Sequence, residues 1–270
     1  MKRLAARLRR ALRDYGNSLF ARTIPIAQFL ETRMIRMALI WLCCTIPLAL
    51  WKFSNTPSVI HDLGDAMPIV VGYTLVILAP CAGYWIARGA FLGERSLSQP
   101  TTRFAIFGRW RRLERGSAEI NPAFGIVGFM VSLLIGLLLN VVMRTGEYFV
   151  AVPAMSAHAP EWGRTMFLMM TAEVVITSFF YMVCFVMALR KIPLFPRMLL
   201  FAWSVDILMQ LHIANQLAEV GGLPASVAEP LTDLLNGNVT KVLISAAVWL
   251  PYLLLSERVN VTYRHRTAAD

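Results

Sequence analysis

The chain has 270 residues, of which 57% are hydrophobic, and its mean hydropathy is +0.58. Soluble domains usually hold just under half apolar residues, so this composition argues against an ordinary soluble domain. The formal net charge is +10. The positions of the basic residues therefore decide whether the charge indicates nucleic acid or a membrane.

The first 22 residues predict an amphipathic helix. At 100° per residue the leucines fall on one arc, while the basic residues, including Arg3, Arg7 and Arg10, fall on the opposite arc. This separation suits a helix in the headgroup layer whose arginines contact anionic lipid. A solvated basic helix that only sets topology, or one that binds a partner protein, remains an alternative.

Six apolar runs follow along the chain. A crossing of the ~30 Å hydrocarbon layer takes roughly twenty apolar residues. A large soluble helical core is the alternative, but helices that are apolar all round need lipid or a very large protein around them. We therefore predict an all-α integral membrane protein with six transmembrane helices, at about 37–53, 67–87, 123–143, 166–189, 198–218 and 239–256.

The basic residues are distributed unequally between the two sides of these spans. Of the 26 Lys and Arg, 22 fall on one side, and the other side holds only Lys52, Arg144, Arg164 and Lys241. Basic residues are enriched in cytoplasmic loops, so both termini are predicted to be cytoplasmic. The charge is thus an orientation signal, and nucleic acid is not expected as a partner because no binding motif frames the basic residues.

The longest segment outside the spans, 88–122, contains three arginines around a tryptophan. Arg109, Arg111 and Arg112 flank Trp110, a pattern typical of an interfacial anchor or a docking surface. We expect these arginines to contact lipid headgroups.

At the end of that segment, Asn121 and Pro122 predict an N-cap and a first-turn proline that open the third span. A boundary here divides the chain into two parts. Residues 1–122 hold the amphipathic helix, two spans and the basic loop, and residues 123–270 hold a four-helix unit with a basic cytoplasmic tail.

Three ionisable residues lie inside the spans: Glu173, Asp206 and His212. Such groups cost on the order of 2.5 to 3.5 kcal/mol near the bilayer centre, so they normally face protein or water. At 1.5 Å per residue, Glu173 and His212 lie about 24 and about 21 Å from the cytoplasmic end, and Asp206 lies about 12 Å from it. We therefore predict Glu173 near His212, and Asp206 near Tyr181 with Gln210 assisting.

These polar residues admit three interpretations. They hold helices together, they line a proton or solute path, or they form an active site. No nucleophile motif or metal-ligand set accompanies them, so no catalytic, cofactor or metal site is expected. The four cysteines lie inside the spans without metal or disulfide spacing.

The last span carries a pattern of aromatic, proline and polar residues: Trp249, Pro251, Tyr252, Ser256 and Arg258, followed by Val259, Thr262 and Tyr263. This pattern resembles the C-terminal signature of the YdgK-like family, small bacterial inner-membrane proteins of unknown function. The basic, proline-containing turn at 190–196 is also similar to that family. The resemblance covers about residues 123–264, and Glu257 departs from it, where a lysine is expected.

The resemblance implies a four-helix membrane unit with cytoplasmic ends in the bacterial inner membrane, and it supplies no catalytic residues. We expect a non-enzymatic accessory or assembly subunit whose partners are membrane lipids and other membrane proteins or a second copy. The alternative is a small transporter or proton-coupled permease that uses Glu173, Asp206 and His212. A lipid-modifying enzyme is a more distant alternative.

Overall fold

The structure is a computed structural model that describes residues 22–91, 98–100, 109–220 and 222–269. Six helices in this part of the chain are long and apolar enough to span a membrane, so the protein is an all-α, multi-pass membrane protein as predicted. They are α2 (Met34–Ser54), α3 (Leu63–Ala90), α5 (Phe129–Ala151), α6 (Glu161–Leu189), α7 (Phe195–Glu219) and α8 (Ala225–Leu255).

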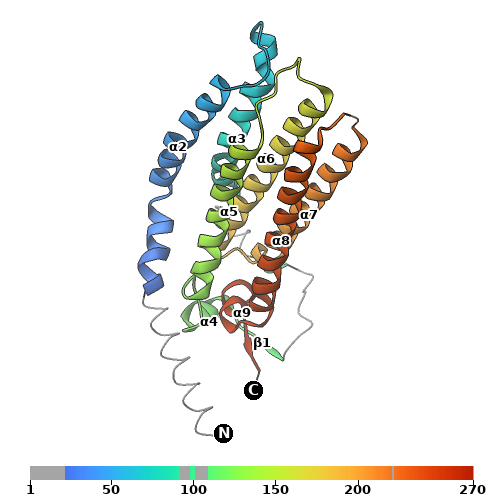
Figure 1. The fold of residues 1–270 in the computed structure, drawn as a ribbon. Coiled ribbons are helices and arrows are strands. Elements are labelled where there is room, and N and C mark those ends of the chain that lie inside the picture. The colour runs from blue at the N-terminus through green and yellow to red at the C-terminus, as the bar shows by residue number, and fades with distance from the viewer. Residues whose placement is uncertain (1–21, 92–97, 101–108, 221, 270) are drawn as a thin grey trace.

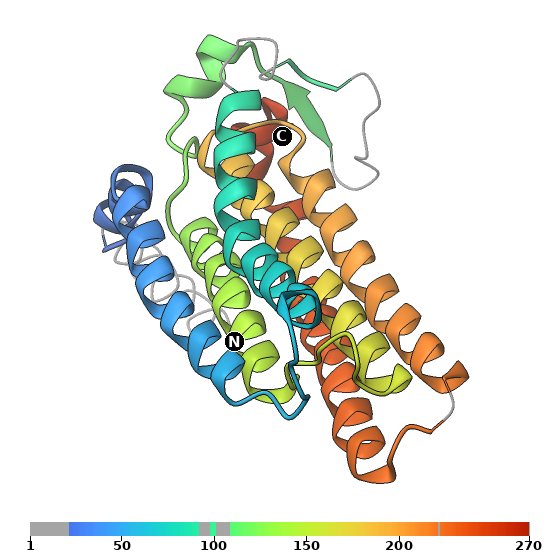
Figure 2. The ribbon, with the colours of Figure 1, turned by 90° about the horizontal axis from the view of Figure 1, so that it is seen from above.

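Helix α6 lies at the centre of the bundle. It packs against α3, α5 and α7, and its apolar window is the most buried of the six. Helices α2 and α7 lie at opposite edges of the bundle in both views (Figure 1, Figure 2). The outer faces carry large apolar side chains, such as Leu39 and Leu208, that are 57% and 63% exposed and suit a lipid environment.

Helices α3 and α6 approach each other closely at a glycine. A Cβ atom added at Gly83 would lie 2.6 Å from the backbone oxygen of Phe179 and 3.1 Å from Cβ of Met182. Small residues allow such close approach of membrane helices, where dispersion contacts rather than the hydrophobic effect favour association. Gly83 is therefore a packing requirement of the α3–α6 pair.

The third span begins later than its predicted start. Asn121 follows the short helix α4 (Arg115–Ile120), and its Oδ1 accepts a hydrogen bond from the N–H of Ala123 at 2.8 Å. Asn121 and Pro122 thus belong to a turn before α5, and their predicted role as the N-terminus of the third span was wrong. Gly128, at φ +66°, directly precedes α5 instead.

The sixth span also differs from its prediction. Helix α8 begins at Ala225, well before residue 239. Leu231 and Leu235 are buried there, one helical turn apart, so packing against neighbouring helices extends the helix beyond the apolar run.

The C-terminal segment folds back against the end of the bundle (Figure 1). After an extended residue at Ser256, helix α9 (Glu257–Arg264) begins, and strand β2 (Arg266–Ala268) then pairs antiparallel with β1 (Trp110–Arg112). Val259 and Tyr263 are fully buried, and the Tyr263 hydroxyl donates to the backbone oxygen of Ala188 at 3.0 Å. The segment predicted as a basic tail is thus a packed part of the fold.

Residues 22–32 are helical and precede α2. The predicted amphipathic helix, with Arg3, Arg7 and Arg10, lies largely outside the described residues. The division of the chain at residue 122 stays a prediction. Strands from both sides of that boundary pair in the small sheet.

Candidate functional site

The centre of the bundle holds an arginine that the sequence analysis had placed outside the spans. Arg144 lies in α5 and is 5% exposed. Leu137, Val141 and Tyr148 are buried with it at helical spacings of seven, three and four residues, so all four occupy the inward face of α5. The guanidinium therefore points into the bundle because of its helical phase.

Arg144 forms ion pairs with two carboxylates from two other helices. Its Nη2 donates to Oδ1 and Oδ2 of Asp206, in α7, at 2.7 and 2.8 Å. Its Nη1 lies 2.9 Å from Oε1 of Glu173, in α6, as an ion pair that does not have hydrogen-bond geometry. Both carboxylates are fully buried. We call Arg144, Glu173 and Asp206 the ion cluster.

Two polar side chains complete the surroundings of the ion cluster. The Tyr181 hydroxyl donates to Oδ2 of Asp206 at 2.7 Å, which confirms the predicted pair. Gln210 donates from Nε2 to Oε1 of Glu173 at 2.9 Å and, more weakly, to Oδ1 of Asp206 at 3.4 Å. The amide thus links the two carboxylates, as a buried charge requires.

The predicted approach of Glu173 to His212 was wrong. His212 is exposed, whereas the fully buried Glu173 contacts Arg144 and Gln210. Asp206 and Gln210 lie on the buried face of α7, and His212 is rotated by about 120° from Asp206 at 100° per residue. Glu173 and His212 were matched by their heights along the helices, but their directions around the helix axes differ.

A line of polar side chains leads from the ion cluster to the exposed side of α8. Asn238 donates to Oε1 of Gln210 at 3.4 Å, and Nζ of Lys241 donates to Oδ1 of Asn238 at 3.5 Å. Lys241 also forms an ion pair with Glu147. Lys241 is exposed, so this line connects the buried charges with one surface of the protein.

The direction from the ion cluster towards α9 is closed by apolar packing. Every residue of α6 from 182 to 188 is buried, including Cys184 and Phe185. Phe195 and Tyr263 pack below them with ring centroids 5.1 Å apart. Within the described residues, the polar chain therefore ends at Tyr181 and does not cross the bundle.

The ion cluster connects three helices through paired, buried charges. Ions buried without partners cost several kcal/mol each, and pairing offsets this cost only when the geometry is good. Among the described residues, Oε2 of Glu173 is buried without a hydrogen-bond partner, so the network is not fully satisfied. No group of three or more His, Cys, Asp or Glu in the described ranges is placed to hold a metal ion.

The signature residues of the last span form the joint between α8 and α9. The rings of Trp249 and Tyr252 meet edge to face at 5.9 Å, and Ser256 is the extended residue at which the helices join. Pro251 lies inside α8. Arg258 donates to the backbone oxygen of Ala123 at 3.2 Å, so it holds the segment before α5.

The arginines and the tryptophan of the 88–122 segment lie in different environments. Arg109, Arg111 and Arg112 are exposed, which leaves their predicted contact with headgroups open. Trp110 is half-buried, with the guanidinium carbon of Arg266 4.9 Å from its ring centroid. The tryptophan thus packs on the C-terminal strand, a contact with protein that the anchor interpretation did not include.

Arg144 was not predicted as a site residue, although the sequence contains a signal for it. The apolar pattern continues beyond it as far as residue 152, so the helix extends past the predicted end at 143. Two carboxylates in neighbouring spans also require a cation nearby, and Arg144 directly follows the predicted third span. Asn238 was missed because a lone buried amide carries no distinctive spacing.

Comparison with known proteins identifies no relative. No protein-family model, no curated protein and no solved structure matches this chain.

Proposed function

We propose that this protein is a non-enzymatic accessory or assembly subunit of the bacterial inner membrane, with both termini in the cytoplasm. The observation that carries the proposal is the closure of the ion cluster. Arg144, Glu173 and Asp206 are at most 5% exposed and are paired with one another, so their charges are used to join helices. A resemblance to the YdgK-like inner-membrane proteins agrees with this proposal.

The distribution of charge supports the proposed orientation. Arg144 is buried in α5 and no longer counts among the loop residues. Lys52 and Arg164 are then the basic residues at the end opposite α9 in the described part of the chain, and Lys241 lies near the middle of α8. The basic bias towards the end that holds α9 is therefore stronger than the sequence count suggested, in the sense expected for a cytoplasmic side.

The exposed face of α7 supports a protein partner. His212 and Asn215 are exposed there beside Leu208 and Leu211. Polar groups that face lipid are costly, and membrane helices place them at helix–helix contacts instead. A second membrane helix, from another protein or from a second copy, would give His212 a polar neighbour.

Photo-crosslinking from this face tests the proposal. A photoreactive phenylalanine at Leu211 should give a protein adduct in native membranes, and the His212→Leu variant should reduce its yield. Leu168, in α6, is a matched control because it is 61% exposed, against 57% for Leu211, and lies at a similar distance from the same end of the bundle. Equal yields at both positions, or lipid adducts alone, would contradict the proposal.

A proton-coupled permease is a second candidate, supported by the polar line from Asp206 to Lys241. Within the described residues that line does not cross the bundle, and His212 lies outside it. A permease would require pH-driven flux in liposomes that Glu173→Gln and Asp206→Asn each abolish while the fold stays intact. The accessory-subunit proposal expects no flux from the wild-type protein.

A further inference from the structure

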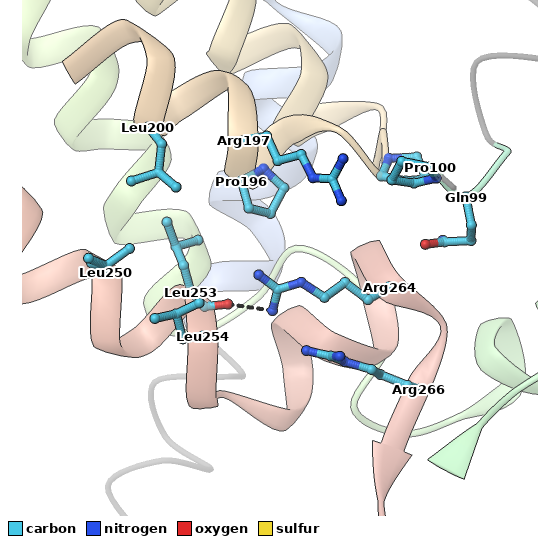
Figure 3. Close-up of a pocket in the computed structure, with 11 residues that line it drawn as sticks. Gln99, Pro100, Pro196, Arg197, Leu200, Leu250, Leu253, Leu254, Arg264 and Arg266 are labelled. Carbon is cyan, nitrogen blue, oxygen red and sulfur yellow. Dashed lines mark hydrogen bonds between the residues drawn. The ribbon is translucent and has the colours of Figure 1, made fainter. Parts of the chain in front are cut away.

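A small pocket with three arginines lies where the ends of α7 and α8 meet α9 and β2. Its volume is ≈ 60 Å³, which exceeds the ~10 to 15 Å³ needed for one water and leaves room for a small polar group. Figure 3 shows Arg197, Arg264 and Arg266 extending into the same space from α7, α9 and β2. The described lining contains no acidic residue.

The arginines are held in place by their neighbours. Arg264 donates from Nη1 to the backbone oxygen of Leu253 at 2.7 Å and to Oδ1 of Asn260 at 2.9 Å. Nε of Arg266 donates to the same Asn260 oxygen at 2.7 Å. Guanidinium groups that are positioned by the protein before binding lose less entropy when they bind an anion.

Three guanidinium groups lie close together at this pocket. Burial, followed by the charges of Arg266 and Arg197, lowers the pKa of Arg264 to about 10. Like charges that lie together disfavour the charged form, and an anion between them reverses this effect. Arginine binds phosphate oxygens with its planar fork of donors.

Apart from Gln99, the remaining wall of the pocket is apolar. Leu200 lies in the second turn of α7, and Leu250, Leu253 and Leu254 lie in the last turns of α8. These positions are the ends of membrane-spanning helices, where the hydrocarbon layer meets the headgroups. An acyl chain can therefore follow the leucines while its phosphate lies among the arginines.

We propose that this pocket binds one anionic phospholipid, with its phosphate between Arg197, Arg264 and Arg266 and its acyl chains against the leucines of α7 and α8. The proposal concerns a lipid site and stands apart from the accessory-subunit role, because neither the ion cluster nor the exposed face of α7 contributes to it. The site also differs from the predicted headgroup contacts at Arg109, Arg111 and Arg112.

Native mass spectrometry of the purified full chain in detergent tests the proposal with three probes: phosphatidylglycerol, phosphatidylcholine with the same acyl chains, and inorganic phosphate. We expect one phosphatidylglycerol to bind at least about ten-fold more tightly than phosphatidylcholine, which corresponds to one charge-assisted contact. Inorganic phosphate should neither bind measurably nor displace the lipid. This comparison needs only wild-type protein.

A matched pair of variants locates the site. Arg197→Gln should weaken phosphatidylglycerol binding about ten-fold. Arg36→Gln, an exposed position of α2 outside the pocket, should leave binding within about two-fold. Equal affinity for the two lipids, equal binding by Arg197→Gln and wild-type protein, or displacement of the lipid by inorganic phosphate would each overturn the proposal.

Discussion

Arg144 determines how the polar residues inside the bundle are arranged. Two carboxylates in adjacent helices repel each other when both are ionised, and the guanidinium between them supplies the compensating charge. Nη1 and Nη2 of Arg144 contact carboxylates from two different helices, so one side chain joins α5, α6 and α7. At the residue scale, the centre of the protein depends on this geometry.

We predict that Arg144→Met destabilises the protein by about 3 to 5 kcal/mol, because removing one partner leaves buried charges without compensation. Thermal unfolding in detergent should show a midpoint lower by on the order of 10 °C. Arg164→Met, at an exposed position, is the control and should change the midpoint little.

The same cluster offers a compensation test. When Glu173→Gln and Asp206→Asn are added to Arg144→Met, no buried charge remains in the cluster, and most of the lost stability should return. A triple variant as unstable as Arg144→Met alone would show that the loss came from packing and not from charge.

Two buried tyrosines give a second prediction. The Tyr181 hydroxyl bonds the Asp206 carboxylate, and Tyr181→Phe should cost about 1.5 to 3 kcal/mol, the range for hydrogen bonds to charged groups. Among the described residues the buried Tyr73 hydroxyl has no hydrogen-bond partner, so Tyr73→Phe should be neutral or stabilising. Equal unfolding midpoints for the two variants would argue against the Tyr181–Asp206 bond.

At the scale of elements, the α3–α6 contact depends on a missing side chain. Gly83→Ala would place a methyl group 2.6 Å from the Phe179 backbone oxygen, and we expect a loss of about 1 to 3 kcal/mol from overpacking. Gly136→Ala, in α5, meets no atom within 4 Å and should be neutral or slightly stabilising. Thermal unfolding of both variants measures the difference.

Helix α9 depends on one buried amide. Asn260 donates to the backbone oxygens of Leu254 at 3.1 Å and Ser256 at 2.9 Å, and accepts from Arg264 and Arg266. Asn260→Ala should therefore loosen the C-terminal segment while the membrane helices stay folded.

Hydrogen exchange can measure this loosening. Amides of α9 and β2 should exchange about ten-fold faster or more in Asn260→Ala, since at least one buried polar group loses its partner. Asn215→Ala removes an exposed amide and should leave the exchange unchanged. Uniformly faster exchange across α5 and α6 as well would point to global destabilisation instead.

At the scale of the whole molecule, the proposed orientation places the end with α4 and α9 in the cytoplasm. A cysteine at Glu119, exposed in α4, should react with a membrane-impermeant maleimide only after lysis. A cysteine at Glu229, exposed at the start of α8, should react in intact cells once the outer membrane is permeabilised. The parent chain provides the background, and the reverse pattern of labelling would reject the orientation.

Much of this architecture follows from the sequence alone. The length and hydropathy of six runs predicted the six long helices, because a bilayer crossing depends on local composition. The Asp206–Tyr181 contact followed from matching heights in a tight helical hairpin. Such properties depend on near neighbours in the chain.

Other properties were decided only by tertiary packing. The pairing of Arg144 with Glu173 and Asp206, the exclusion of His212 and the burial of α9 depend on how helices rotate about their axes and on segments far apart in sequence. Height along a helix can be counted from residues, but rotation is set by which faces pack together. The three-arginine pocket likewise forms where the packed C-terminal segment, α9 and β2, meets the ends of α7 and α8.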